Sequence, residues 1–138
     1  MAAKVWAHER VPFDIPHGDT TAVALYGEYA SAAPAALQIV RGYSKDHRPD
    51  LKQVGMGLVA NSEGIPWPGD VHDGNLNDTV WNAQVIGDLQ RLLPEETLRS
   101  ILYTADCKVV TPDNLLAMDK AGPIGSVGCP RPTARPKR

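Results

Sequence analysis

Residues 42–60, GYSKDHRPDLKQVGMGLVA, place a polar, charged stretch directly ahead of an apolar one. Leu51 is the one aliphatic hydrophobe before VGMGLVA, which is itself bounded by polar residues and predicts a strand buried on both faces. NSEG at 61–64 predicts a turn into IPWPGDV, so the two apolar segments should form a hairpin. Pro66 and Pro68 cannot donate to a hydrogen-bond ladder, which predicts that this second arm is an edge strand.

A first strand is predicted ahead of the hairpin, from Asp19 to about Gly27. There TTAVALYGEY is rich in β-branched and aromatic residues, and its larger apolar side chains alternate. Residues 30–40 contain Pro34 among several alanines, which leaves a short helix and a loop equally open.

Helices and strands alternate after the hairpin. A helix is predicted where apolar residues recur at helical spacing between a polar N-cap and a proline stop. These residues are Trp81, Val85, Leu89 and Leu92, preceded by Asn77 or Asp78 and followed by Pro94. SILYTADCK predicts a strand from about Ser100 to Thr104. TPDNLLAMDKAG predicts a helix between Pro112 and Gly122, and PIGSV a last strand.

This order predicts an α/β fold with one mixed sheet, antiparallel in its early strands and parallel where helical crossovers join the later ones. A chain of 138 residues fits a single domain. Residues 1–18 show no sustained period and are expected to be an irregular lead-in to a domain at 19–127. Residues 128–138 hold three prolines and four basic residues with little that is apolar, so we expect a disordered tail.

Charge and composition limit the possible partners. The formal net charge of −2 gives no global basic signature, so any contact with nucleic acid must come from a local patch. Cys107 and Cys129 match neither a CxxC pattern nor a disulfide framework, and reduced thiols are expected. No stretch approaches the roughly 20 apolar residues that span a bilayer, so we expect a cytoplasmic protein without a membrane partner.

Two aspartates are candidates for a functional site in such a sheet. Asp19 stands at the head of the first strand, and Asp106 directly follows ILYTA. On neighbouring strands the two carboxylates would repel each other, and a divalent cation with hard oxygen ligands, such as Mg²⁺, would relieve that repulsion. Such a site can support phosphodiester cleavage. The alternative is that both are turn or cap residues bonded to nearby backbone amides.

The histidines offer a competing metal hypothesis. His17 with Asp19, and His72 with Asp73, supply ligands for zinc or iron, but neither spacing matches a strong ligand pattern. A GxSxG elbow, a phosphate-binding P-loop and a GxGxxG fingerprint are all missing from the sequence. Serine-nucleophile and nucleotide-binding functions therefore receive no support.

The wording of GYSKDHRPDLKQ resembles the signature segment of insertion-sequence transposases of the IS-four-like DDE group, in which a similar stretch precedes a strand like VGMGLVA. Three further segments agree with the family in order and spacing: DTTAVALYGEY, GIPWPGDVHDGNLNDTVWN and LYTADCKVVTPDNL. The resemblance extends from about Asp19 to Val127, and its motifs are specific.

This resemblance implies a ribonuclease H-like fold, a central five-stranded mixed sheet with flanking helices, in which the first and fourth strands are neighbours. It implies that Asp19 and Asp106 are the first two acids of a catalytic triad that binds Mg²⁺ or Mn²⁺. The implied function is cleavage and joining of DNA at insertion-sequence ends. The implied partners are those ends, target DNA, and a second copy of the chain or an intact transposase.

The family's third acid is a glutamate on a helix beyond the fifth strand, and nothing acidic follows Asp119 in this sequence. The resemblance therefore leads us to expect a domain that is incomplete at the C-terminus, a truncated transposase with impaired activity. Whether the chain is an active enzyme is left open. The alternative is a non-catalytic DNA-binding or dimerising remnant.

The charged segment carries a candidate DNA contact. A local basic cluster, able to bind phosphates in a salt-dependent manner, consists of Lys45, His47, Arg48 and Lys52, with Arg41 nearby. The alternative is a solvated hairpin arm whose aspartates and arginines pair with one another.

Overall fold

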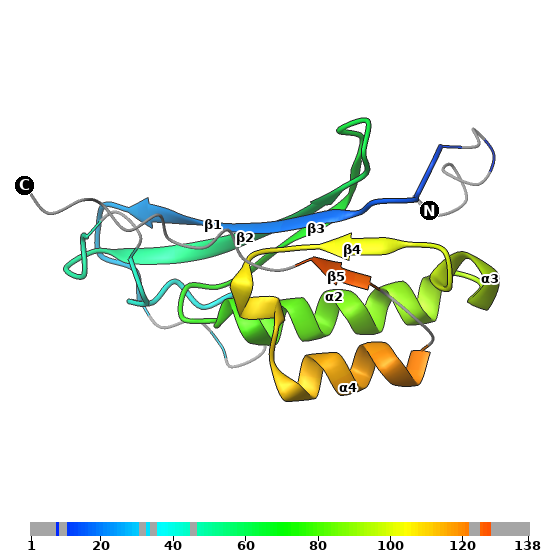
Figure 1. Cartoon of the computed structure of the whole chain (residues 1–138). Coiled ribbons are helices and arrows are strands. Elements are labelled where there is room, and N and C mark those ends of the chain that lie inside the picture. Colours follow the sequence, from blue (N-terminus) through cyan, green and yellow to red (C-terminus); the bar gives the residue numbers. More distant parts are fainter. Residues whose placement is uncertain are drawn as a thin grey trace, which may run out of the picture.

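Five strands form one mixed sheet in the computed structural model, which describes residues 8, 11–30, 33, 36–44, 47–121 and 125–127 (Figure 1). The strands are β1 (His17–Leu25), β2 (Lys52–Ala60), β3 (Pro66–Asp73), β4 (Leu102–Thr104) and β5 (Gly125–Val127). Their order in the sheet is β3-β2-β1-β4-β5. The first three pair antiparallel, whereas β1 with β4 and β4 with β5 pair parallel. The predicted mixed five-stranded sheet is confirmed, and β3 is the edge strand that its prolines indicated.

The helices are α2 (Asp78–Leu92), α3 (Glu95–Leu98), η1 (Cys107–Val109) and α4 (Pro112–Ala121). Helix α2 has the predicted bounds, because the Asn77 side chain accepts a hydrogen bond from the Thr79 amide at its start and Pro94 follows its end. The short helix α3 follows Pro94 and connects α2 to β4. Among the described residues, no helix has the length and apolar character needed to cross a membrane.

Among the described residues, helices pack on one face of the sheet and leave the other open. Figure 1 shows α2 and α4 on the same side of the sheet. On the opposite side, Met56 and Leu58 of β2 are 46% and 50% exposed. The expectation that VGMGLVA is buried on both faces is therefore wrong. The run looked uniformly apolar because the outward positions carry Met56 and Leu58 where a half-exposed strand usually has polar residues, and glycines occupy the inward positions between them.

The two glycines of β2 allow two close approaches, of α2 at Gly57 and of the His72 ring of β3 at Gly55. A Cβ on Gly57 would lie 2.1 Å from Nε1 of Trp81, and one on Gly55 would lie 1.8 Å from the His72 ring. Trp81 is 2% exposed, and its Nε1 donates a 2.8 Å hydrogen bond to Asp70 of β3. The absence of a side chain at Gly57 therefore sets how near α2 lies to β2, and its absence at Gly55 makes room for the His72 ring of β3.

Two hydrophobic clusters fill the space between the sheet and the helices. The larger one joins α2, β4, η1 and α4 and contains Ile86, Leu89, Leu98, Ile101, Tyr103, Val109 and Met118. The smaller one, Val59, Trp67 and Trp81, joins β2, β3 and α2. Phe13 packs against both clusters, which ties the segment before β1 into the core.

The segment ahead of β1 is more ordered in its backbone bonding than an irregular lead-in suggests. Strand β1 begins at His17, and the carbonyls of Asp14 and Pro16 accept hydrogen bonds from the amides of Leu102 and Thr104, both at 2.8 Å. Residues 1–7 and 9–10 of the predicted lead-in, the predicted tail at 128–138, and Lys45 lie outside the described residues.

Replacing Gly57 with alanine should lower the free energy of unfolding by about 1–3 kcal/mol, because the new methyl group would displace the buried Trp81 ring. Denaturant titration followed by tryptophan fluorescence measures this change. Gly87→Ala is the matched control, since Gly87 lies in α2 with open space around it and should gain up to about 1 kcal/mol. Equal midpoints for Gly57→Ala and the wild type would contradict the close-approach argument.

Candidate functional site

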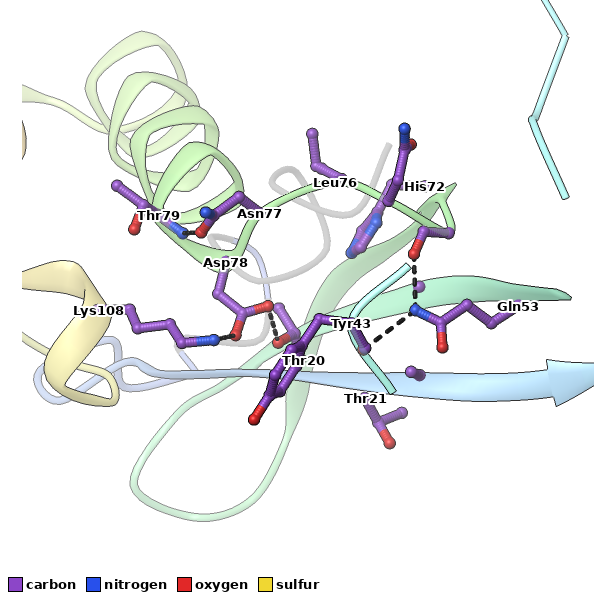
Figure 2. A pocket seen from close by; sticks show the side chains of 14 residues that line it. Thr20, Thr21, Tyr43, Gln53, His72, Leu76, Asn77, Asp78, Thr79 and Lys108 are labelled. Atoms are coloured by element: carbon purple, nitrogen blue, oxygen red, sulfur yellow. Dashed lines mark hydrogen bonds and ion pairs between the residues drawn. The ribbon is translucent and has the colours of Figure 1, made fainter. Parts of the chain in front are cut away.

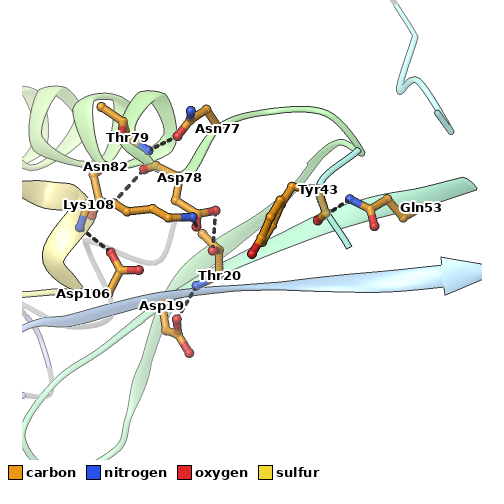
Figure 3. Close-up of polar contacts among 10 residues, drawn as sticks. All are labelled: Asp19, Thr20, Tyr43, Gln53, Asn77, Asp78, Thr79, Asn82, Asp106 and Lys108. Carbon is orange, nitrogen blue, oxygen red and sulfur yellow. Dashed lines mark hydrogen bonds and ion pairs between the residues drawn. The ribbon is translucent and has the colours of Figure 1, made fainter. Parts of the chain in front are cut away.

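The sheet brings the two predicted acids to one place. Strands β1 and β4 are neighbours, and their parallel register pairs His17 with Thr104. Asp19 and Asp106 each lie two residues beyond that pair, so they reach the same level where β4 ends. Both side chains are exposed, and Figure 3 shows them with the surrounding polar contacts. Asp19 lies within β1 and Asp106 just after β4, so the neighbouring-strand condition of the metal-site hypothesis is met.

Each aspartate also makes the local bond expected of a turn residue. Oδ1 of Asp19 accepts a hydrogen bond from the Thr20 amide at 2.8 Å, and Oδ1 of Asp106 accepts one from the Lys108 amide at 3.0 Å. A carboxylate has about four acceptor positions, so one such bond orients it and leaves capacity for a cation. The local bonding is therefore compatible with either interpretation.

A third carboxylate, Asp78, links the segments that carry these two acids. Its Oδ1 accepts a 2.8 Å hydrogen bond from the Thr20 hydroxyl, and its Oδ2 lies 2.6 Å from Nζ of Lys108. The Asp78 side chain is only 14% exposed. The hydrogen bond to Asp78 raises the pKa of Lys108, partly offset by burial of the ammonium group. The sequence offered Asn77 or Asp78 as the helix N-cap, and Asn77 fills that role. Sequence reasoning did not single out Thr20 or Lys108.

The negative charge of Asp106 also affects the pKa of a buried residue, Tyr103. Burial, with a smaller contribution from the negative charge of Asp106, raises the pKa of the Tyr103 hydroxyl. That hydroxyl donates a 2.8 Å hydrogen bond to Oδ1 of Asn82 in α2. Tyr103 also lies under Gly18, where an added Cβ would be 2.3 Å from its oxygen. Tyr103 thus fixes β4 against both β1 and α2 shortly before Asp106 in the sequence.

A cavity of about 480 Å³ with both polar and apolar lining lies beside this network (Figure 2). Thr20, Asp78 and Lys108 form one side of it, and Tyr43 and His72 contribute rings to the other. Nζ of Lys108 lies 5.6 Å from the centre of the Tyr43 ring. The side-chain amide of Gln53 donates to the carbonyls of Gly74 and Tyr43, which fixes the loop ends around the cavity.

Neither His17 nor His72 belongs to a set of three metal ligands among the described residues. Within the part of the chain that the structure describes, no group of three or more His, Cys, Asp or Glu side chains is arranged to hold a metal ion. Nδ1 of His72 lies 3.1 Å from the Asp73 carbonyl, not against its carboxylate. A three-ligand zinc or iron centre around His17 or His72 is therefore absent from those residues.

The predicted basic cluster lies away from the acids. Lys52 pairs with Leu25 in the β1–β2 ladder, whereas Asp19 pairs with Leu58, so roughly 20 Å of strand separates them. Arg48, in the loop before β2, forms a bidentate pair with Asp50 at 2.8 and 2.7 Å.

Other members of this cluster have structural partners as well. The Arg48 guanidinium also lies 5.7 Å from the Tyr26 ring centre, and the Lys52 ammonium donates to the Tyr29 carbonyl. His47 occupies the left-handed region of backbone conformation with φ of 56°. The pairing expected of a solvated hairpin arm is thus present, and DNA contact by these residues stays a prediction.

The Arg48–Asp50 pair predicts a measurable titration. The hydrogen bonds from Arg48 lower the pKa of Asp50 to about 2. In Arg48→Gln the Asp50 midpoint should rise toward the ordinary value of about 3.9, followed by carboxyl ¹³C NMR. Because the folded pKa is the lower one, the pair stabilises the fold above about pH 3.9, and this contribution disappears as pH falls through about 2.

Asp14 serves as the internal control for that titration. Its pKa is lowered chiefly by the Ser62 hydroxyl, so it should not respond to the change at Arg48. An Asp50 midpoint near 3.9 in the wild-type protein would show that the bidentate pair does not form in solution.

Comparison with known proteins identifies the fold. No protein-family model and no curated protein matches the sequence. A solved structure of a Mos1 transposase paired-end complex with left transposon end matches with a TM-score of 0.51 and 9% identity, covering 95% of this chain and 39% of that one. A pre-cleavage Mos1 transpososome matches with a TM-score of 0.50 and 12% identity, covering 94% and 41%. The chain thus spans about two-fifths of these proteins, and at this identity the likeness shows that it has their ribonuclease H-like mixed-sheet fold.

Proposed function

We propose that this chain is a catalytic portion of a DNA transposase, which cleaves and joins phosphodiester bonds at the ends of a mobile element. The observation that carries the proposal is the matched position of Asp19 and Asp106 on the parallel pair β1 and β4. It is supported by the fold shared with a transposase solved in complex with a transposon end.

The donor set suits a hard divalent cation. Asp19 and Asp106 offer exposed carboxylate oxygens, the ligands that Mg²⁺ and Mn²⁺ prefer, and exposure leaves room for water and a phosphate beside them. When bound, such an ion supplies Lewis-acid polarisation of a phosphodiester and lowers the pKa of water. The protein's own contribution is to hold two like charges together, each carboxylate oriented by a backbone amide, Thr20 for Asp19 and Lys108 for Asp106.

We expect this chain by itself to cleave and join DNA only weakly. Two carboxylates supply few of the six or more oxygen ligands that such an ion takes, and no third His, Cys, Asp or Glu joins them among the described residues, so we expect low metal affinity. The assignment to the IS-four-like group rests on the sequence motifs around Lys45 and Asp106. The partners proposed with it are insertion-sequence ends, target DNA and a second copy or an intact transposase.

A dimerising, non-catalytic protein is the second candidate function, and one observation favours it. Met56, Leu58 and Val71 lie side by side on the open face of the sheet and are 46%, 50% and 52% exposed. Contiguous exposed apolar surface of this kind commonly marks a protein contact. We define these three residues as the open apolar face.

Metal binding tests the first proposal. Mn²⁺ titration followed by electron paramagnetic resonance should give one weak site, and Asp19→Asn or Asp106→Asn should each weaken it more than about 100-fold, beyond the effect typical of residues that only support a ligand. Asp88→Asn removes an exposed aspartate of α2 that pairs with Arg91 and should leave the affinity unchanged.

Strand cleavage completes that test. Nicking of a plasmid that carries the sequences flanking the coding region should require Mg²⁺ or Mn²⁺ and should be lost in both aspartate variants. Nicking that survives in the Asp19→Asn, Asp106→Asn double variant would rule the proposed site out.

Sedimentation tests the second candidate. A dimer held by the open apolar face should dissociate when Leu58 is replaced by lysine, because a charge would be desolvated at the contact. Val80→Lys is the control, since Val80 is an equally exposed apolar residue of α2, at 46%. A monomeric wild-type protein at all accessible concentrations would exclude dimerisation through this face.

A further inference from the structure

We propose that Asp78 is a positioning residue that sets the spacing of Asp19 and Asp106 by holding the segment after β4 against β1. This inference rests on the proposed function in one respect, that the spacing of the two acids matters for binding a metal ion. The contact itself joins residues far apart in sequence, with 58 positions from Thr20 to Asp78 and 30 from Asp78 to Lys108.

The need for such a contact follows from where the β1–β4 ladder stops. The register ends with His17 opposite Thr104, and the next residues after Ala105 turn into η1. Both acids lie beyond this last pair. Two carboxylates repel each other, so without a further connection the chain after β4 would relax away from β1.

Asp78 supplies a connection to both sides. Thr20 directly follows Asp19 and donates its hydroxyl to one oxygen of Asp78, and Lys108 brings its ammonium to the other. The backbone amides of the same two residues donate hydrogen bonds to the acids, Thr20 to Asp19 and Lys108 to Asp106. Figure 3 shows this chain of contacts running from Asp19 through Asp78 to Asp106.

Asp78 is itself held firmly enough to act as a reference point. It is the first residue of α2, and its carbonyl accepts a 2.8 Å hydrogen bond from the side-chain amide of Asn82. Asn82 is buried and accepts a hydrogen bond from Tyr103 of β4. The helix end is therefore tied to β4 through the core and to β1 and η1 through the Asp78 carboxylate.

Burial makes the Asp78–Lys108 pair stronger than an ordinary surface pair. The side chains are 14% and 42% exposed, whereas the Arg91–Asp88 pair on the same helix is 72% and 54% exposed. Exposed pairs of the second kind are screened by water and salt and contribute little. With both oxygens engaged by Thr20 and Lys108, Asp78 is suited to position the acids.

Amide hydrogen exchange measured by NMR tests the contact without any metal. The Thr20 and Lys108 amides, which bond the two acids, should exchange about fivefold faster or more in Asp78→Asn and in Lys108→Met. Lys108→Arg keeps the charge and should restore slow exchange. Asp88→Asn is the matched control on the same helix, and the Leu89 amide in the core reports on global stability. Lys108→Met, at a partly exposed site, keeps the test valid if Asp78→Asn fails to fold.

Mn²⁺ affinity tests the use of the contact. In Asp78→Asn and Lys108→Met it should fall about tenfold, as is typical for groups that orient metal ligands, with recovery in Lys108→Arg. Unchanged exchange of both amides would overturn the proposal. So would faster exchange with unchanged Mn²⁺ affinity in a protein whose affinity does depend on Asp19. If exchange accelerates but wild-type affinity is independent of Asp19 and Asp106, the positioning contact stands and the proposed metal-dependent function fails.

Discussion

The close approach of α2 to the sheet is the constraint on which the rest of the structure depends. Trp81 can lie against β2 because position 57 carries no side chain, and its indole bond to Asp70 fixes the helix over β3 as well. A helix seated at this height brings its first residue, Asp78, within reach of Thr20 on the neighbouring strand β1. A larger residue at position 57 would therefore alter the polar contacts at the end of the helix as well as the core beneath it.

The polar contacts around Asp19 and Asp106 depend on this position of α2. Tyr103 and Asn82 connect β4 to α2 inside the core, and Asp78 connects α2 to β1 at its surface. Each acid is oriented by the amide of a residue that Asp78 also holds. Packing in the core and the ion pair of the largely buried Asp78 with Lys108 therefore fix the segments that carry the two acids.

Local sequence patterns predicted the helices and strands, but they could not predict contacts between residues far apart in the sequence. The bounds of α2 followed from its apolar spacing, from Asn77 and from Pro94, and the edge position of β3 followed from its prolines. The open face was missed because Met56 and Leu58 occupy outward positions where a half-exposed strand usually has polar residues. Lys108 was missed for a different reason. Its partner Asp78 lies 30 positions away, so no spacing rule connects them, and only the fold reveals the pair.

The surface between the basic loop and the acids bears on how a large partner could bind. Along β1 and β2 the outward side chains between Lys52 and Asp19 include Val23, Met56 and Leu58, which are 37–50% exposed. A DNA backbone gains little from apolar side chains, since its contacts are made by charged and hydrogen-bonding groups. A single duplex running along this face would therefore leave its middle unsupported. Asp19 pairs with Leu58 across β1 and β2, and the two line one hollow with Met56 and Val71, so a partner bound on the open apolar face would also contact the first acid.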